Sequence, residues 1–355
     1  MTTPNKSTVE HKKEHYGDLR PKGSISYVKG SRVPPLVYAT IPQLLKQSVS
    51  QYGLRDALIF PNHRLSYYDF DRAVDALAIG FLALGLNKGD RLGIWSPNRL
   101  EWVLTQFATA RIGVVLVNIN PAYRLSELEY SLNKVGCKAL VLAKSFKSSE
   151  YLQMICTLAP EIDTCCRGEL QATKLPNLRH VIVMDDVEGF SGLWSFEDIT
   201  ALGGSAEKLQ LIEIDKNLTP DDSINIQFTS GTTGQPKGAT LSHYNIVNNA
   251  SLTTDRIKLT EADRLAIPVP LYHCFGMVMG VLGAVSKGAA MVFPGEAFDA
   301  EQTLDTLAKE KCTALYGVPT MFVAMLQELD KRPRDLSTLR TGIMAGAPCP
   351  VEVMK

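Results

Sequence analysis

The sequence has no excess of charge of either sign. Its 355 residues carry 37 Lys and Arg against 37 Asp and Glu, which gives a formal net charge of zero. A protein that binds nucleic acid needs a basic field, and an interaction tail needs a block of like charge. The sequence contains neither, so it argues against nucleic acid as a partner and leaves small molecules as the expected ones.

Cysteine and histidine patterns typical of disulfide frameworks and metal sites are also missing. The seven cysteines are scattered, their number is odd, and no C-x-x-C occurs. In the absence of a secretory leader, this usage predicts a reduced compartment and argues against zinc. The histidines are dispersed, apart from His11 and His15 in a polar, charge-rich stretch. We therefore predict no metal site built from these side chains.

A long uninterrupted hydrophobic helix is absent as well. Residues 265–285 contain no Asp, Glu, Lys or Arg, and a segment of that length could span a bilayer. However, Pro268, Pro270, Tyr272 and His273 interrupt its first half. We therefore predict a strand, a loop and a buried helix there, with no membrane span.

The sequence does contain an alternation of strand and helix patterns. A chain of this length is expected to form about two domains. We predict a flexible polar arm at 1–35, a first α/β subdomain at 36–215 and a second at 216–355. Near-continuous apolar strands alternating with helices predict an α/β fold of two layered subdomains, with mostly parallel sheets flanked by helices. The predicted strands are 57–60, 91–95, 114–119, 139–142, 179–184, 223–228, 239–242, 289–293, 314–316 and 342–344.

Two capping patterns predict where helices begin. Thr40 with Gln43 three residues later forms a capping box, and Pro42 suits a first helical turn. Ser126 and Glu129 form a second box of the same kind. The other helices are predicted at about 68–85, 99–111, 148–158, 245–255, 301–310 and 319–329.

A ten-residue segment near the middle of the chain carries the strongest functional signal. It lies between two predicted strands and contains three glycines, four hydroxyl side chains and one lysine. Glycines let backbone N–H groups converge on a ligand, hydroxyls add donors, and the lysine adds positive charge, which suits a polyphosphate. The segment consists of Thr229, Ser230, Gly231, Thr232, Thr233, Gly234, Gln235, Pro236, Lys237 and Gly238.

This segment is not the common nucleotide P-loop. Counting from Gly231, Pro236 stands where the second glycine belongs and Gly238 where the Mg²⁺-binding hydroxyl belongs. A flexible Gly/Thr hairpin turn without a ligand is the alternative interpretation, since such turns are common. The string from Ile226 to Lys237 resembles the AMP-binding signature of the adenylate-forming enzymes, which include acyl-CoA synthetases, peptide-synthetase adenylation domains and luciferases.

Three further segments extend this resemblance. The residues from Pro270 to Gly276 are similar to a segment of acyl-CoA synthetases in which the position of His273 lines the acyl pocket near the carboxylate. Without the resemblance, a packed or capping histidine is the more common interpretation. The 316–322 segment also matches the family, although a strand–turn–helix junction explains it equally. Gly346, Ala347 and Pro348 follow a predicted strand, where the crevice rule places ligands. By resemblance they stack along adenine.

The resemblance covers about 26–355 and is nearest to fatty acyl-CoA synthetases of the medium-chain type. It implies ATP and Mg²⁺ as cofactors and coenzyme A as co-substrate: a carboxylate and ATP give acyl-AMP and pyrophosphate, and the acyl group then passes to coenzyme A. It also implies a mitochondrial location. Otherwise a cytoplasmic one is expected, because acidic residues in the first 35 positions argue against a strong presequence.

The family pattern includes further segments that this sequence does not contain. The Tyr-Gly-x-Thr-Glu segment, the Thr-Gly-Asp segment and the catalytic lysine of the family have no match in it. We therefore expect these 355 residues alone to be inactive as a ligase. Two alternatives stay open: a non-catalytic nucleotide- or acyl-binding remnant, and an aryl- or amino-acid adenylation domain.

Overall fold

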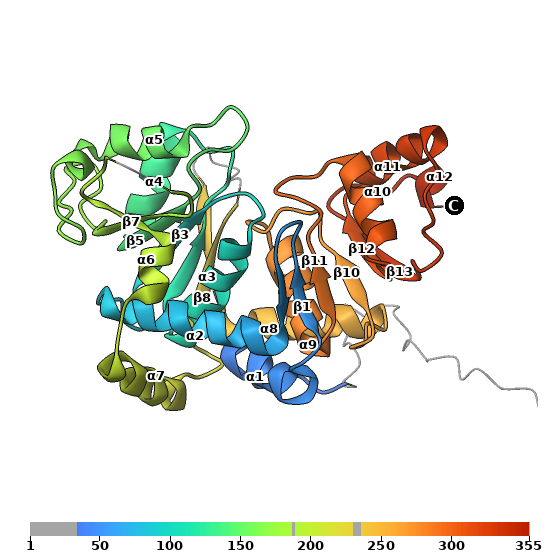
Figure 1. Cartoon of the computed structure of the whole chain (residues 1–355), viewed down its shortest axis with the longest axis horizontal. Helices are drawn as coiled ribbons and strands as arrows, with labels where there is room; N and C mark the ends of the chain where they lie inside the picture. The colour runs from blue at the N-terminus through green and yellow to red at the C-terminus, as the bar shows by residue number, and fades with distance from the viewer. Residues whose placement is uncertain (1–33, 187–188, 230–235, 355) are drawn as a thin grey trace, which may run out of the picture. The chain divides into compact units, whose positions relative to one another are not determined.

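A computed structural model describes residues 34–186, 189–229 and 236–354 (Figure 1). The chain divides into two units, Met1–Leu36 and Val37–Lys355. The predicted arm at 1–35 lies almost entirely outside the described residues, as do Ser230 to Gln235 of the signature segment. The architecture that follows is that of the second unit.

The described strands form two sheets. The six-stranded sheet has the order β13-β12-β10-β11-β1-β2. Its strands, in chain order, are β1 (Asp56–Ile59), β2 (Arg64–Ser66), β10 (Arg264–Ala266), β11 (Ala290–Val292), β12 (Ala314–Gly317) and β13 (Thr341–Met344).

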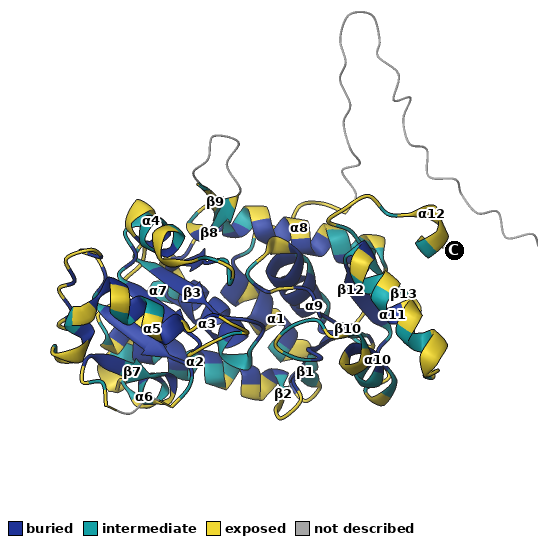
Figure 2. Ribbon diagram, turned by 90° about the horizontal axis from the view of Figure 1, so that it is seen from above, coloured by how far each residue is buried: buried dark blue, intermediate teal, exposed yellow. Residues whose placement is uncertain are grey.

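The seven-stranded sheet has the order β7-β6-β5-β3-β4-β8-β9. Its strands are β3 (Arg91–Trp95), β4 (Val115–Asn118), β5 (Ala139–Leu142), β6 (His180–Val183), β7 (Leu193–Ser195), β8 (Ser223–Thr229) and β9 (Lys237–Ser242). Three of these strands, β4, β5 and β6, are buried along their whole length, and the middle of the sheet is dark blue in Figure 2.

Both sheets are parallel except at one edge each. β1 pairs with β2 antiparallel, β8 pairs with β9 antiparallel, and every other neighbouring pair among the described strands is parallel. Parallel strands need both faces covered, which explains why their sequences are near-continuous apolar runs. The predicted fold class, α/β with mostly parallel sheets flanked by helices, is confirmed.

The strands of the two sheets do not separate at a single position in the chain. β1 and β2 join the six-stranded sheet although they precede all seven strands of the other sheet, and β8 and β9 complete the seven-stranded sheet. The predicted boundary between residues 215 and 216 stays a prediction. Each of the two sheets contains strands from both sides of it.

Helices connect the strands and cover the sheets (Figure 1). The longer ones are α1 (Ile41–Tyr52), α2 (Tyr67–Ala83), α3 (Leu100–Arg111), α4 (Leu125–Val135), α5 (Tyr151–Leu158), α7 (Ser205–Asn217), α8 (His243–Arg256), α10 (Ala300–Lys309) and α11 (Pro319–Lys331). The short ones are η1 (Pro160–Asp163), α6 (Phe196–Ala201), α9 (Gly283–Lys287) and α12 (Val351–Met354), and the π-helix η2 spans Phe275–Leu282.

The first capping prediction is confirmed and the second is wrong by two residues. The hydroxyl of Thr40 accepts from the Gln43 backbone N–H at 3.3 Å, while the Gln43 side chain accepts from the Thr40 N–H at 2.9 Å. Helix α4 begins at Leu125, because the Glu127 carboxylate accepts from the Arg124 N–H at 3.2 Å. Ser126 donates to that same carboxylate at 3.1 Å and therefore does not act as the cap.

One large buried apolar cluster takes side chains from both sheets and from α1, α2, α3, α8 and η2. It includes Leu45 of α1, Phe70 of α2, Trp102 of α3, Val247 of α8 and Val281 of η2. A smaller cluster lies under α10 and α11 and contains Leu304, Leu307 and Met325. The two sheets are thus tied together by a shared core, and the strand ends that carry the site are fixed by it.

The apolar 276–285 run forms a π-helix followed by α9, so the predicted buried helix is confirmed and its first part is a π-helix. Gly276 lies so close to the chain before it that a Cβ there would be 2.4 Å from the Pro270 carbonyl oxygen. π-Helices are rare and are frequently found at functional sites. Among the described residues no helix has the length and apolarity needed to cross a membrane.

Candidate functional site

The signature segment connects two antiparallel strands. Thr229 ends β8 and pairs with Lys237, the first residue of β9. The predicted loop between strands is confirmed at both ends, with β9 beginning two residues earlier than expected. Ser230, Gly231, Thr232, Thr233, Gly234 and Gln235 lie outside the described residues, so the structure places the stem of this hairpin.

The end of the hairpin loop is held from a neighbouring helix. The hydroxyl of Tyr130 on α4 donates to the carbonyl oxygen of Pro236 at 3.2 Å. Lys237 is exposed and has no partner for its ammonium group among the described residues. A cation without a protein partner at the base of a Gly/Thr loop is available to an anionic ligand.

His273 caps the start of the π-helix. Its Nδ1 atom accepts from the Phe275 backbone N–H at 3.1 Å, and its own backbone N–H donates to the Pro270 carbonyl at 3.3 Å. Partial burial lowers the pKa of the His273 imidazole, although the residue still reaches solvent. The neutral ring therefore carries its proton on Nε2 and can donate one hydrogen bond from there. The capping interpretation is thus confirmed, and a role toward substrate stays a prediction.

A ladder of side-chain amides joins the β8 strand to the turn that carries His273. Asn225 donates to the Asn118 side-chain oxygen at 2.9 Å, and Gln227 donates to the Asn225 side-chain oxygen at 3.0 Å. The Asn118 amide donates in turn to the Tyr272 carbonyl at 2.8 Å. The thioether of Met277 lies 3.1 Å from the amide nitrogens of both Asn118 and Gln227.

This ladder fixes the position of the signature hairpin relative to the His273 turn. Asn118 and Asn225 are almost fully buried, so their hydrogen bonds are shielded from water. The sequence pattern around Asn118 indicates only a structural stretch and does not reveal the ladder. A signal is present nonetheless, because Asn118 is a polar residue at the end of the otherwise apolar strand β4, and it pairs directly with Gln227 of β8.

Asn98 is a second buried amide that the sequence patterns do not identify. Its side chain donates to the Val269 carbonyl at 3.0 Å and accepts from the Leu271 N–H at 2.8 Å. Its own backbone N–H donates to the Glu296 carbonyl at 3.0 Å. Asn98 lies just after the end of β3 and therefore fixes the 269–271 segment, which leads into the His273 turn.

A cleft of about 530 Å³ lies at the carboxyl ends of strands from both sheets. Its walls are the loops that follow β3, β4, β5, β10 and β11, together with Met321 of α11. Tyr272 lies on one wall, and Arg124 and Lys147 bring positive charge to another. This is where the crevice rule places a ligand in a parallel sheet.

Gly346, Ala347 and Pro348 follow the end of β13 and are all exposed. Gly346 has a φ of 89°, and a Cβ there would lie 3.2 Å from Cγ1 of Val318. Glycine is therefore favoured at this position by its backbone as well as by its neighbour. The predicted position at a strand end is confirmed, while contact with adenine stays a prediction.

Aromatic packing connects the His273 turn to β13. The ring of Phe275 stacks on Tyr316 of β12 with centroids 5.5 Å apart, and Tyr316 pairs with Ile343 of β13. The structure thus brings the 346–348 loop into the same region as His273 through one strand. The Tyr316 hydroxyl is buried and has no hydrogen-bond partner in the part of the chain that the structure describes.

No group of three or more His, Cys, Asp or Glu side chains within 34–186, 189–229 and 236–354 is arranged to hold a metal ion. The Mg²⁺ implied by the resemblance is therefore assigned no ligands among these residues.

The model of a family described as "AMP-binding enzyme" matches residues 45–355. The chain is also similar to a curated protein of Danio rerio named medium-chain acyl-CoA ligase ACSF2, mitochondrial, with 46% identity over 339 residues. That alignment covers 94% of this chain and 56% of the relative. The protein of the same name in Homo sapiens is 42% identical over 342 residues, with 94% and 55% covered. The chain thus spans about half the length of the curated relatives it matches.

Solved structures show the same fold. The anthranilate CoA ligase AuaEII, crystallised in complex with anthranoyl-AMP, matches with a TM-score of 0.75 and 24% identity. The match covers 90% of this chain and 57% of that one. At this level of identity the likeness concerns the fold alone.

Proposed function

The chain belongs to the family of AMP-binding enzymes, and from this premise we propose that it is the ATP- and acyl-binding part of a fatty acid–CoA ligase that acts on medium-chain acids. The observation that carries the proposal is the amide ladder from Gln227 through Asn225 and Asn118 to the Tyr272 carbonyl. It fixes the signature hairpin and the His273 turn as one unit, as a reaction between a nucleotide and a carboxylate requires. The names of the curated relatives support the choice of substrate.

We assign ATP to the hairpin that begins after Thr229 and ends at Lys237. The Lys237 ammonium group is free to meet the β- and γ-phosphates, and Tyr130 steadies the end of the loop. The reaction places negative charge on the α-phosphate and on the departing pyrophosphate, and fixed donors and a cation stabilise that charge. Mg²⁺ would add positive charge as the complex with ATP.

We assign the fatty-acid carboxylate to the neighbourhood of His273. With Nδ1 occupied by the Phe275 N–H, the Nε2–H group can donate to one carboxylate oxygen. The other oxygen then attacks the α-phosphorus of ATP, the bond to the bridging oxygen breaks, and pyrophosphate leaves. In this assignment His273 orients the nucleophile and takes no proton.

We assign coenzyme A to the 530 Å³ cleft. Coenzyme A has phosphates at one end and a thiol on a thin arm, and the cleft has Arg124 and Lys147 on one wall and Tyr272 on another. The sulfur attacks the acyl carbonyl, the thiol proton is lost to water, and AMP leaves. A mitochondrial location is proposed from the names of the relatives and is tested by fractionating cells that express the tagged protein.

Binding of MgATP tests the proposal most directly. Titration calorimetry compares the chain with Lys237→Met, and with Lys216→Met as a matched control, because Lys216 is an exposed lysine of α7 paired only with Glu213. Loss of one charge-assisted contact to phosphate should weaken ATP binding about tenfold or more in Lys237→Met. The control should bind ATP like the parent chain.

Release of pyrophosphate with octanoate and of AMP with coenzyme A then tests the reaction itself, in the gene product that carries this sequence. ATP binding without octanoate-dependent pyrophosphate release would favour the nucleotide-binding remnant. Release that depends on an aryl or amino acid, and not on octanoate, would favour the other adenylation class. Equal ATP affinity of the parent chain and Lys237→Met would remove the hairpin from the nucleotide site.

A further inference from the structure

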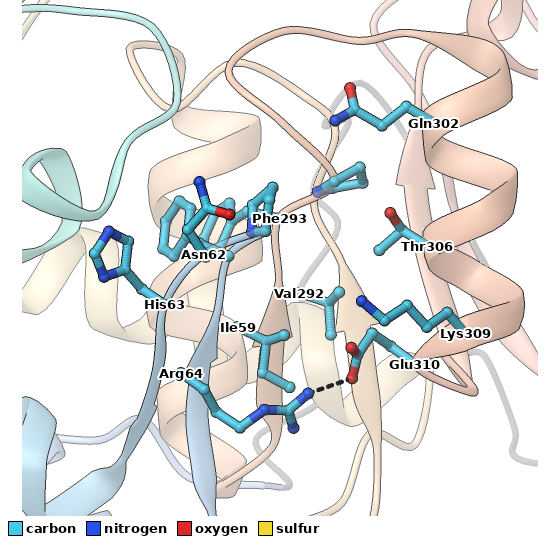
Figure 3. Close-up of a pocket in the computed structure, with 13 residues that line it drawn as sticks. Ile59, Asn62, His63, Arg64, Val292, Phe293, Gln302, Thr306, Lys309 and Glu310 are labelled. Atoms are coloured by element: carbon cyan, nitrogen blue, oxygen red, sulfur yellow. Dashed lines mark hydrogen bonds and ion pairs between the residues drawn. The ribbon is translucent and has the colours of Figure 1, made fainter.

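A second cavity, of about 410 Å³, lies between the β1–β2 hairpin, the end of β11 and helix α10 (Figure 3). We name it the hairpin–α10 cavity. None of the signature residues, His273 or the 346–348 loop lines it. It lies at the carboxyl ends of the parallel strands β1 and β11, the edge at which ligands bind in open parallel sheets.

The floor of the cavity is apolar and rigid. Ile59 and Val292 are paired neighbours on β1 and β11, and both are buried. The rings of Phe60 and Phe293, which follow them, stack with centroids 4.3 Å apart. Figure 3 shows Ile59 and Val292 between the hairpin on one side and α10 on the other. Such a floor suits the apolar body of a small molecule.

Polar side chains without protein partners line the walls. Gln302, Thr306 and Lys309 project from one face of α10, and Asn62 faces them from the hairpin turn (Figure 3). Across the described residues, no side-chain hydrogen bond or ion pair is formed by any of these four. Donors that converge on an apolar floor without satisfying one another are the usual make-up of a small-molecule site.

The charge of the cavity comes from Lys309. Arg64 and Glu310 also line it, but they belong to a closed ring of ion pairs: Arg64 lies 2.6 Å from Asp56 and 2.7 Å from Glu310, and Arg264 lies 3.1 Å and 2.6 Å from the same two carboxylates. The ring is neutral and closes the lower end of the cavity, as the dashed pair in Figure 3 shows. Lys309 is left as one uncompensated positive charge.

From this geometry we propose that the hairpin–α10 cavity binds a small monocarboxylate with a compact apolar body. The carboxylate meets the Lys309 ammonium and the Thr306 hydroxyl, and the body lies on Ile59 and Val292. The single positive charge of Lys309 matches a singly charged carboxylate, whereas a phosphate dianion carries a second negative charge that this one cation does not compensate.

One wall of this cavity is shared with the segment that borders the 530 Å³ cleft. Pro294 lines the hairpin–α10 cavity and Glu296 lines the cleft. Between them, Gly295 lies so close to Gln302 that a Cβ there would be 2.7 Å from the Gln302 side-chain oxygen. The Glu296 carbonyl accepts from Asn98, which holds the His273 approach. A carboxylate in the cavity therefore lies one chain segment, 294–296, away from the cleft proposed for coenzyme A.

Methyl NMR of the chain labelled at isoleucine δ1 positions tests the proposal, with benzoate as the probe. The Ile59 signal, identified with Ile59→Val, reports on the cavity floor, and Ile182 in the seven-stranded sheet serves as the control methyl. Benzoate should shift Ile59 saturably and leave Ile182 unmoved. Benzylamine, with the opposite charge, should not shift Ile59, and phenyl phosphate should bind more weakly than benzoate.

Variants on α10 make the test specific. Lys309→Met should weaken benzoate binding about tenfold, and Thr306→Val should weaken it severalfold without changing the charge. Lys331→Met on α11, an exposed lysine outside the cavity, should change nothing. The proposal is overturned if Ile59 shows no saturable shift with benzoate, if benzylamine shifts it equally, or if Lys309→Met binds benzoate like the parent chain. None of these outcomes depends on ATP binding or acyl transfer. The experiment therefore tests the cavity independently of the proposed ligase function.

Discussion

The side-chain amide of Asn118 donates a 2.8 Å hydrogen bond to the carbonyl oxygen of Tyr272, and this bond connects the end of β4 to the turn that carries His273. The two residues are far apart in the chain and lie on elements of different sheets. Because the donor is buried and continues into Asn225 and Gln227, the contact sets the distance between the two halves of the proposed site.

Replacing Asn118 with Leu should damage both stability and activity. The change removes the Tyr272 contact and leaves the buried Asn225 amide with only its bond to the Leu116 carbonyl, which should cost about 1–3 kcal/mol of the free energy of unfolding. Urea unfolding measures this cost, and octanoate-dependent pyrophosphate release measures the effect on the site. Asn133→Leu is the matched control, since Asn133 donates only to the Lys174 carbonyl at the surface. Equal effects of the two changes would contradict a special role of the ladder.

The pKa shift of His273 predicts the pH dependence of acid activation. Burial lowers its pKa, so the ring is neutral above its ordinary value of 6.5 and becomes protonated at a lower pH than a free imidazole. In the gene product that carries this sequence, we expect kcat/KM for octanoate to be constant across neutral pH and to fall on an acidic limb below 6.5, because protonation of Nδ1 breaks its bond to the Phe275 N–H and releases the ring from its position. His273→Phe, which lacks the Nε2–H donor, should raise KM and remove that limb. An acidic limb unchanged in His273→Phe would assign it to another group.

Two buried histidines predict a loss of stability in mild acid. Burial lowers the pKa of His180 and of His243 from 6.5 to about 4. The unfolded chain therefore binds more protons than the folded chain between these values, so stability falls as pH falls through this window. Each histidine should account for about 3 kcal/mol between pH 7 and pH 4.

Urea unfolding at a series of pH values checks this expectation. His243→Gln should lower stability at pH 7.5, because the His243 ring accepts from the Ile41 N–H at the start of α1. It should also flatten the dependence on pH below 6.5. A pH dependence identical to that of the parent chain would show that His243 is not a source of the acid sensitivity.

Substitutions of Gly346 test both the backbone geometry at this position and the preference for the length of the acyl chain. A side chain at its φ of 89° is strained and approaches Val318, so Gly346→Ala should cost about 1 kcal/mol in thermal or urea unfolding. We also predict an apolar acyl tunnel bordered by His273, Cys274, Phe275 and the 346–348 loop, so Gly346→Trp should fill it and shift the preference toward shorter acids. The rates of acyl-CoA formation with C4 to C12 acids measure this. If both variants keep the parent profile, the tunnel lies elsewhere.

Local signals in the sequence predicted the helices and strands well. They were much less informative about which distant segments pair or contact one another. The Thr40 box and the apolar strands depend on neighbouring residues, and both are confirmed. The pairing of β1 with β11 joins residues more than half the chain apart, and strand patterns alone do not report such a pairing. The buried amides Asn98 and Asn118 have partners that are backbone groups of a distant turn, and local patterns do not identify these partners. Hydrophobic periodicity also cannot report the π-helix or the close approach of Gly276 to Pro270 at its start.

The pairing of Leu58 with Met291 also affects how the protein is made. After β1 leaves the ribosome, roughly 230 further residues must be added before its parallel neighbour exists. At ~5–20 residues per second this takes about 10 to 50 seconds. Throughout that interval Ala57, Leu58 and Ile59, all buried in the finished sheet, belong to a strand with one open edge. The strands of the seven-stranded sheet are all synthesised between β2 and β10, so that sheet can assemble during this interval. The first strand to be synthesised is therefore among the last to be fully paired. Chaperones that bind exposed apolar strands are needed longest at β1.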